Sequence, residues 1–112
     1  MKIVTYHSPQ LDAAFQALGN DKRRGMVQTL SYRPATITQL AEEFDLSLPA
    51  IHKHIRSLEK AKLIQRKKVG RTNFVALDRQ SLRRAQDWIA QFRTEWGNDK
   101  ETLENYIASL QT

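Results

Sequence analysis

The residues with the clearest chemistry are basic ones gathered in a single stretch of the chain. Residues 52–73 hold eight lysines or arginines and one acid, Glu59, so this stretch has a formal charge of +7. The eight basic residues are Lys53, Arg56, Lys60, Lys62, Arg66, Lys67, Lys68 and Arg71. Such a concentration of positive charge attracts polyanions and speeds their association. A solvated surface that only keeps the protein soluble is the alternative interpretation, and charge alone does not separate the two.

Metal binding and catalysis find little support in the residue types present. His52 and His54 are two residues apart, so on a helix they point about 200° away from each other and cannot chelate one ion. His7 lies far off in the sequence, and the chain has no cysteine. Disulfides, zinc-thiolate sites and thiol redox chemistry are therefore excluded. No catalytic triad, glycine-rich phosphate loop or pair of catalytic carboxylates stands out. We expect no enzyme activity, no cofactor and no metal site.

Helix caps divide the part of the chain before the basic stretch into short helices. Ser8 followed by Pro9 is typical of a helix start, and Gly19 of its end. The expected cap residues of the four helices are, in order, Ser8, Asn20 or Asp21, Thr36 or Thr38, and Ser47. The second helix ends before Pro34, since proline cannot continue it.

The third and fourth helices form a pair that can pack face to face. Ile51, Ile55 and Leu58 share one face of the fourth helix, and the third helix offers Leu40, Ala41 and Phe44 to cover it. Apolar and β-branched residues in 64–69 and 72–77 flank a Gly70-Arg71 turn, which indicates a β-hairpin. Two helices joined by a tight turn and followed by a basic hairpin are the element order of a winged helix-turn-helix.

Residues 79–111 show a heptad pattern that predicts a long helix with a dimerisation face. The seam consists of Leu82, Ile89, Trp96, Leu103 and Leu110. Ala85, Phe92 and Tyr106 occupy the matching offset positions, which Asp99 interrupts. Such seams pair helices, and because the phase is kept across Gly97 we favour a continuous helix. A ligand pocket or base-stacking surface around Trp88 and Trp96 is the weaker alternative, and we expect Trp88 to pack on the body of the domain.

From Phe15 to about Leu110 the chain resembles ArsR-family transcriptional regulators. The matching stretches are 17–24 (ALGNDKRR), 40–44 (LAEEF), 46–55 (LSLPAIHKHI), 58–64 (LEKAKLI), the wing residues Gly70-Arg71, and 74–78 (FVALD). This resemblance implies a homodimer closed by the first and last helices, which binds an inverted-repeat operator and represses nearby genes.

Several departures from the family pattern limit what the resemblance carries over. Thr36 and Thr38 align with the positions where well-known metal sensors of this family place two cysteines, and hydroxyls are poor ligands for such metals. The last helix lacks the histidines that other members use. Leu48 stands where a glutamine is frequent, and leucine contacts a thymine methyl group but cannot read adenine. We therefore expect a regulator that is not a metal sensor, and the resemblance carries over neither an operator sequence nor an inducer.

The sequence thus predicts one mainly α-helical domain over residues 1–112, with a DNA-binding body and wing at 8–77 and a dimerisation helix at 78–112. The predicted DNA-binding residues are Ser47, Leu48, Ala50, His52, Lys53, His54, Arg56, Lys67, Lys68, Arg71 and Asn73. Ala50, His52 and Lys53 are expected to read base edges, while Arg56, Lys67, Lys68 and Arg71 hold phosphates. For His54 we expect either a phosphate contact or partial packing in the fold.

The predicted dimer interface comprises Leu11, Phe15, Leu82, Ile89, Phe92, Trp96 and Leu103. The function expected is that of a sequence-specific, dimeric repressor of double-stranded DNA, located in the cytoplasm because no signal peptide or membrane span is visible. Two alternatives remain: a winged-helix module that binds an acidic protein, and a non-specific architectural or RNA-binding protein. The second is weakened because no aromatic residue is interleaved with the basic block.

Overall fold

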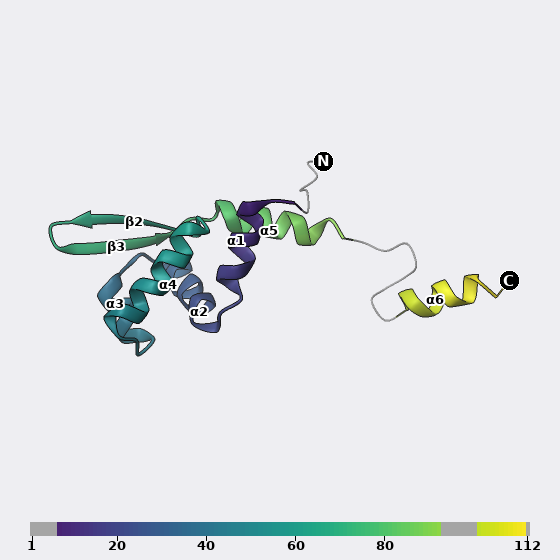
Figure 1. The fold of residues 1–112 in the computed structure, drawn as a ribbon, viewed down its shortest axis with the longest axis horizontal. Helices are drawn as coiled ribbons and strands as arrows, with labels where there is room; N and C mark the ends of the chain where they lie inside the picture. Colours follow the sequence, from purple (N-terminus) through teal and green to yellow (C-terminus); the bar gives the residue numbers. More distant parts are fainter. Residues whose placement is uncertain (1–6, 93–100, 112) are drawn as a thin grey trace.

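The computed structural model describes residues 7–92 and 101–111 as a set of helices from which a β-hairpin projects (Figure 1). The elements are α1 (Pro9–Leu18), α2 (Asp21–Tyr32), β1 (Ala35–Thr36), α3 (Ile37–Glu43), α4 (Leu48–Lys60), β2 (Ile64–Val69), β3 (Thr72–Leu77), α5 (Gln80–Ala90) and α6 (Thr102–Ser109). This order confirms the predicted winged helix-turn-helix, with α3 and α4 as the two helices and β2–β3 as the wing. None of the helices in the described ranges has the length and apolar character of a membrane span.

The helix starts follow the predicted caps and settle the two open choices. Asn20 rather than Asp21 caps α2, with its Oδ1 accepting a hydrogen bond from the N–H of Arg23 at 3.1 Å. Thr36 rather than Thr38 caps α3. Its Oγ1 accepts a hydrogen bond from the N–H of Gln39, and Gln39 Oε1 accepts one from the N–H of Thr36, which completes a capping box. The Ser47 hydroxyl accepts from the N–H of Ala50 at 3.3 Å and so fixes where α4 begins.

The sheet contains one strand more than the hairpin that the sequence predicts. β3 pairs antiparallel with β2 on one side and with β1 on the other, so the strand order is β1-β3-β2. Val69 faces Thr72 across the hairpin turn, and Gly70 there has a φ of +62°, a conformation that glycine adopts without strain. β1 has only two residues directly before α3, too few to show an alternation pattern, and it anchors the helix-turn-helix to the wing.

The core forms where α4 meets the other helices and the sheet. The fully buried large side chains are Met26, Leu40, Ile51, Ile55, Leu58, Leu63 and Val75. The three from α4 are those predicted to face inward, and each is 0% exposed. Because these three side chains are closely packed in the core, they fix the orientation of α4. The opposite side of the helix is the part that solvent or a ligand can reach.

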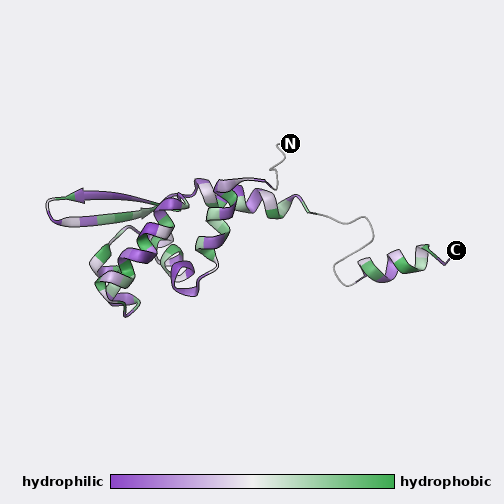
Figure 2. Ribbon diagram, in the orientation of Figure 1, coloured by the Kyte–Doolittle hydropathy of each residue, from purple (hydrophilic) through white to green (hydrophobic). Residues whose placement is uncertain are grey.

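The C-terminal part departs from the single helix predicted over 79–111. α5 ends at Ala90, Gln91 caps it, and α6 begins at Thr102, so residues 91 and 92 are not helical. Continuity through Gly97 lies outside the described residues. Ile89 and Leu103 of the seam are 57% and 66% exposed, and Phe92 at an offset position is 60% exposed. Short helices gain most of their stability from packing of such a face. α6, which Figure 2 colours with several hydrophobic residues, has no buried residue in the single chain.

Candidate nucleic-acid interface

The exposed face of α4 carries the side chains that the sequence assigned to DNA. Leu48 is 58% exposed, Lys53 and Arg56 are exposed, and Ala50 and His52 are half-buried. The Ser47 cap puts the N-terminus of α4, with its positive dipole end, on this side of the molecule. A helix that presents cations and its N-terminus on one face is suited to a major groove and its flanking phosphates.

The wing and α4 meet in a hollow of about 360 Å³ that brings several predicted residues together. From α4 it is lined by Leu48 and His52, and from the wing by Arg71, Thr72 and Asn73. The start of α3 closes it with residues 36–38. Residues separated by about twenty positions in the sequence therefore share one concave surface, which fits a ligand that contacts both the helix and the wing.

The two wing lysines do not face the same side. Lys67 lies opposite Phe74 and Lys68 opposite Asn73 in the β2–β3 ladder, and both are exposed. Successive side chains on a strand point to opposite faces of the sheet. Lys68 therefore shares a face with Asn73, and Lys67 points to the opposite face of the hairpin.

Arg66, a basic residue of the 52–73 block, forms an ion pair with Glu59, the one acid of that block. Its Nη2 lies 2.9 Å from Oε1 of Glu59 and its Nε donates to Oε2 at 3.2 Å, a two-bonded ion pair between β2 and the end of α4. This contact joins β2, at the base of the wing, to the C-terminal end of α4. The sequence signal for it was the single acid in a basic stretch, Glu59.

His54 is turned toward α2 and away from the wing. Its Nδ1 lies 3.2 Å from Nη1 of Arg23. Partial burial lowers the pKa of His54 below its ordinary 6.5, and the positive charges of Arg23 and Lys22 lower it further, while Asp21 acts in the opposite direction. His54 is thus neutral near pH 7 and accepts from Arg23. The sequence did not single out Arg23, because its partners lie on two other helices, Gln16 and Ala17 on α1 and His54 on α4.

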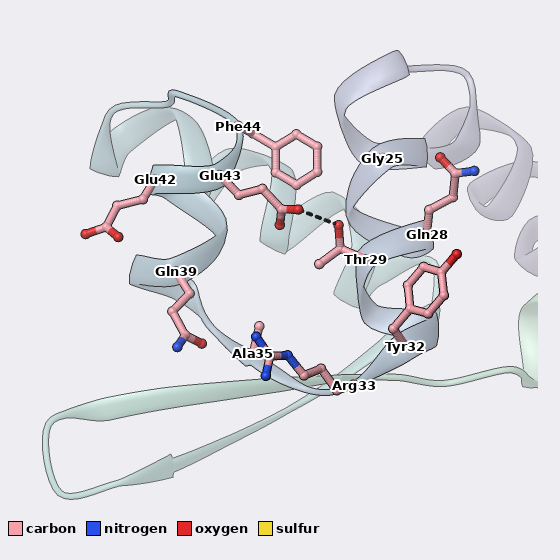
Figure 3. A pocket seen from close by; sticks show the side chains of 10 residues that line it. All are labelled: Gly25, Gln28, Thr29, Tyr32, Arg33, Ala35, Gln39, Glu42, Glu43 and Phe44. Atoms are coloured by element: carbon pink, nitrogen blue, oxygen red, sulfur yellow. Dashed lines mark hydrogen bonds between the residues drawn. The ribbon is translucent and has the colours of Figure 1, made fainter.

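A wide hollow between α2 and α3, of about 910 Å³, lies apart from these residues (Figure 3). Phe44 forms part of its wall beside Gly25, and Thr29 donates a hydrogen bond to Glu43 across it at 3.1 Å. A Cβ at position 25 would come within 2.6 Å of the Phe44 ring, so the glycine permits this close approach. Glu42 and Glu43 make this surface unsuited to nucleic acid, and none of the predicted DNA contacts lines it.

An aromatic cluster joins α1 to α5 on the side of the predicted dimer face. The Trp88 ring packs edge-on against Phe15 at 5.6 Å and against Phe92 at 4.6 Å between ring centroids. Leu11 is only 4% exposed and Leu82 packs against the chain's own core. In the single chain Leu11 thus has little surface left for a partner and Leu82 is half-buried, while the predicted dimer interface as a whole stays a prediction. Trp96 lies outside the described residues.

Comparison with known proteins places this geometry among transcriptional regulators. A family model described as a helix-turn-helix domain matches residues 18–66. The HTH-type transcriptional regulator Rv2034 of Mycobacterium tuberculosis is 35% identical over 74 residues, which cover 66% of this chain and 67% of that protein. The transcriptional repressor SdpR of Bacillus subtilis is 26% identical over 89 residues, or 80% of this chain and 99% of the repressor.

The fold comparison gives the same result. The crystal structure of an ArsR family transcriptional regulator superposes with a TM-score of 0.72 at 36% identity, covering 78% of this chain and 91% of the other. Both the fold and the sequence are therefore similar over most of the two chains.

Proposed function

As a member of the ArsR family of winged helix-turn-helix transcriptional regulators, the chain is a DNA-binding regulator, and we propose that it acts as a homodimeric repressor at an inverted-repeat operator. The observation that carries this proposal is the hollow shared by Leu48 and His52 of α4 with Arg71 and Asn73 of the wing. The similarity to a protein named a transcriptional repressor supports the direction of regulation.

In this proposal α4 lies in the major groove and the wing reaches the adjacent backbone. Ala50, His52 and Lys53 read base edges near the N-terminal end of α4, and Leu48 adds an apolar contact to a thymine methyl group. Phosphates are held by Ser47 at the helix start and by Arg56, Lys67, Lys68 and Arg71. Asn73 lines the same hollow as His52. In the proposed complex its side-chain amide donates to the phosphate backbone of the DNA.

The dimer forms through the exposed apolar surface of α1 and α5, and Leu103 of α6 also contacts the partner chain. Phe15, Ile89 and Phe92 are 37%, 57% and 60% exposed, and the rings of Phe15 and Phe92 pack on Trp88. The indole Nε1 of Trp88 is buried in the single chain without a hydrogen-bond acceptor among the described residues. A two-fold axis through this surface sets the two recognition helices about one DNA turn, roughly 34–36 Å, apart.

The regulator does not sense metal through the α3 site known from the family. Thr36 and Thr38 stand at the cysteine positions, and the Thr36 hydroxyl is engaged as the cap of α3, where it accepts from Gln39 N at 3.1 Å. Binding of the operator is therefore expected to be insensitive to zinc or arsenite at concentrations that release metal-sensing relatives.

A reporter driven by the upstream region of the chain's own gene tests the direction of regulation. Expression of the protein should lower reporter output, and a variant with Arg56 and Arg71 replaced by glutamine should restore it. Reporter output that rises with the intact protein would assign activation. Output that responds equally with an unrelated promoter would favour the architectural alternative.

A further inference from the structure

α4 has a second hollow, of about 450 Å³, on the flank that faces α2 and not the wing. Its lining includes Arg23 from α2 and Lys53, His54, Arg56, Ser57 and Lys60 from α4. Every permanently charged side chain in this lining is basic. On a helix, His54 points about 200° away from His52, which lines the hollow beside the wing, so the two hollows lie on different flanks of α4.

The acidic residue of α4 does not offset the charge in this hollow. Glu59 is held on the wing side by Arg66, at 2.9 and 3.2 Å, and is absent from the lining. On the other side, Asp21 acts on His54 from α2, yet Arg23 and Lys22 each act on it more strongly with the opposite sign. The ion pair with the wing thus leaves the flank facing α2 electropositive.

Arg23 is held in place before any ligand arrives. Its Nε donates to the carbonyl of Ala17 at 2.8 Å, its Nη2 donates to the carbonyl of Gln16 at 3.2 Å, and its Nη1 contacts His54. A guanidinium carries five N–H donors in a planar fork, so these three contacts fix its position without using all of them. A fixed arginine loses less conformational entropy when it binds an anion than a free one does.

A recognition helix in the major groove has a phosphate backbone on each side of it. The wing contacts the backbone on one side. We propose that the hollow between α4 and α2 binds a backbone phosphate of the other strand, with Lys60 and Arg23 as charged donors and Ser57 as a hydroxyl donor. This inference rests on the proposed function, since it assumes that α4 enters the groove. It adds contacts from Arg23, Ser57 and Lys60 to those that the sequence predicts.

The chemistry that the hollow recognises is a phosphate group, and a free phosphate compound is the second possible source. The two sources differ in one property. A backbone contact releases condensed counterions and changes the salt dependence of DNA binding, whereas a free ligand binds the protein without DNA.

The test compares Lys60→Gln with Arg84→Gln, a matched control that removes one exposed positive charge on α5. Binding of the gene's upstream duplex and of a scrambled duplex is measured by fluorescence anisotropy across a salt series. For Lys60→Gln we expect about tenfold weaker binding to both duplexes and a slope of log K against log salt that is smaller by about 0.9. Ser57→Ala should weaken binding by a smaller factor without changing the slope, because it removes no charge.

A Lys60→Gln protein with the slope and affinity of Arg84→Gln would overturn the proposed contact. In a second arm, inorganic phosphate is titrated at constant ionic strength while the His54 ring signals are followed by NMR. Saturable millimolar binding that Lys60→Gln abolishes, together with an unchanged DNA slope, would assign the hollow to a free phosphate compound and also overturn it. If the unmodified protein does not prefer the upstream duplex, the proposed repressor function fails, while the difference in slope still decides the phosphate contact.

Discussion

The guanidinium Nη1 of Arg23 lies 3.2 Å from Nδ1 of His54, and through this contact one side chain joins three helices. Arg23 belongs to α2, its other donors satisfy carbonyls at the end of α1, and His54 belongs to the recognition helix. α1 also carries Phe15, which packs on Trp88 in the proposed dimer surface. Arg23 therefore links the recognition helix α4 to α1, and Phe15 links α1 to the surface where a second chain would bind.

Protonation of His54 should weaken this connection. The folded state holds the pKa of His54 below 6.5, through burial and the nearby cations Arg23 and Lys22, so the unfolded chain takes up this proton at a higher pH than the folded one. Stability is then present above pH 6.5 and declines as pH falls below it. An NMR titration of the His54 ring should show a midpoint below 6.5 that rises in Arg23→Gln. A midpoint at or above 6.5 in the intact protein would contradict this interpretation.

Arg23→Gln should destabilise the fold more than the neighbouring replacement Arg24→Gln. Arg23 satisfies two carbonyls and His54 in a partly buried position, whereas Arg24 donates to the carbonyl of Leu18 on an exposed surface. We expect a loss of about 1–3 kcal/mol for Arg23→Gln and less than 1 kcal/mol for Arg24→Gln. Urea denaturation followed by circular dichroism measures both. Equal losses would show that the three-helix contact adds nothing to stability.

Phe92→Asp should convert the dimer to monomers that bind DNA poorly. The ring is 60% exposed and packs on Trp88, so a carboxylate there would have to be desolvated in the dimer. Tyr32→Asp is the control, since Tyr32 is 88% exposed on α2, away from α5. Sedimentation equilibrium should give a monomer for the first variant and a dimer for the second. A dimer that survives Phe92→Asp would place the interface on another surface.

Lys53→Ala distinguishes base reading from phosphate binding. Lys53 is exposed on the outward face of α4 and also lines the hollow toward α2. If it reads a base, binding to the upstream duplex should weaken by about 1–3 kcal/mol while binding to random DNA changes little. An equal loss on both duplexes, with a smaller salt slope, would make Lys53 a phosphate contact.

The fold was predictable from local signals wherever a cap or a periodic apolar pattern marked it. Ser8 and Ser47 mark helix starts, and the spacing of Ile51, Ile55 and Leu58 identifies the buried face of α4. β1 was missed because two residues carry no period. The end of α5 at Ala90 was missed because a heptad pattern reports a preference for helix and not whether packing supports it.

The candidate site was predictable by residue type but not by arrangement. The basic residues of α4 and the wing were identified from their charge and the hairpin turn. The alternation of Lys67 and Lys68 follows from strand geometry once β2 is identified. That Arg66 is bound by Glu59 and that His54 faces Arg23, by contrast, depend on contacts between elements. No spacing rule within one element encodes such contacts, and they decide which cations remain available to DNA.

The most direct test of the central claim is fluorescence anisotropy with the gene's own upstream region and a scrambled duplex, each across a salt series. A specific regulator should bind the upstream duplex at least about 10³-fold more tightly than the scrambled one at physiological salt. Equal affinity for both duplexes, lost steeply as salt rises, would mean that only phosphates are recognised. That result would contradict sequence-specific repression and favour an architectural role.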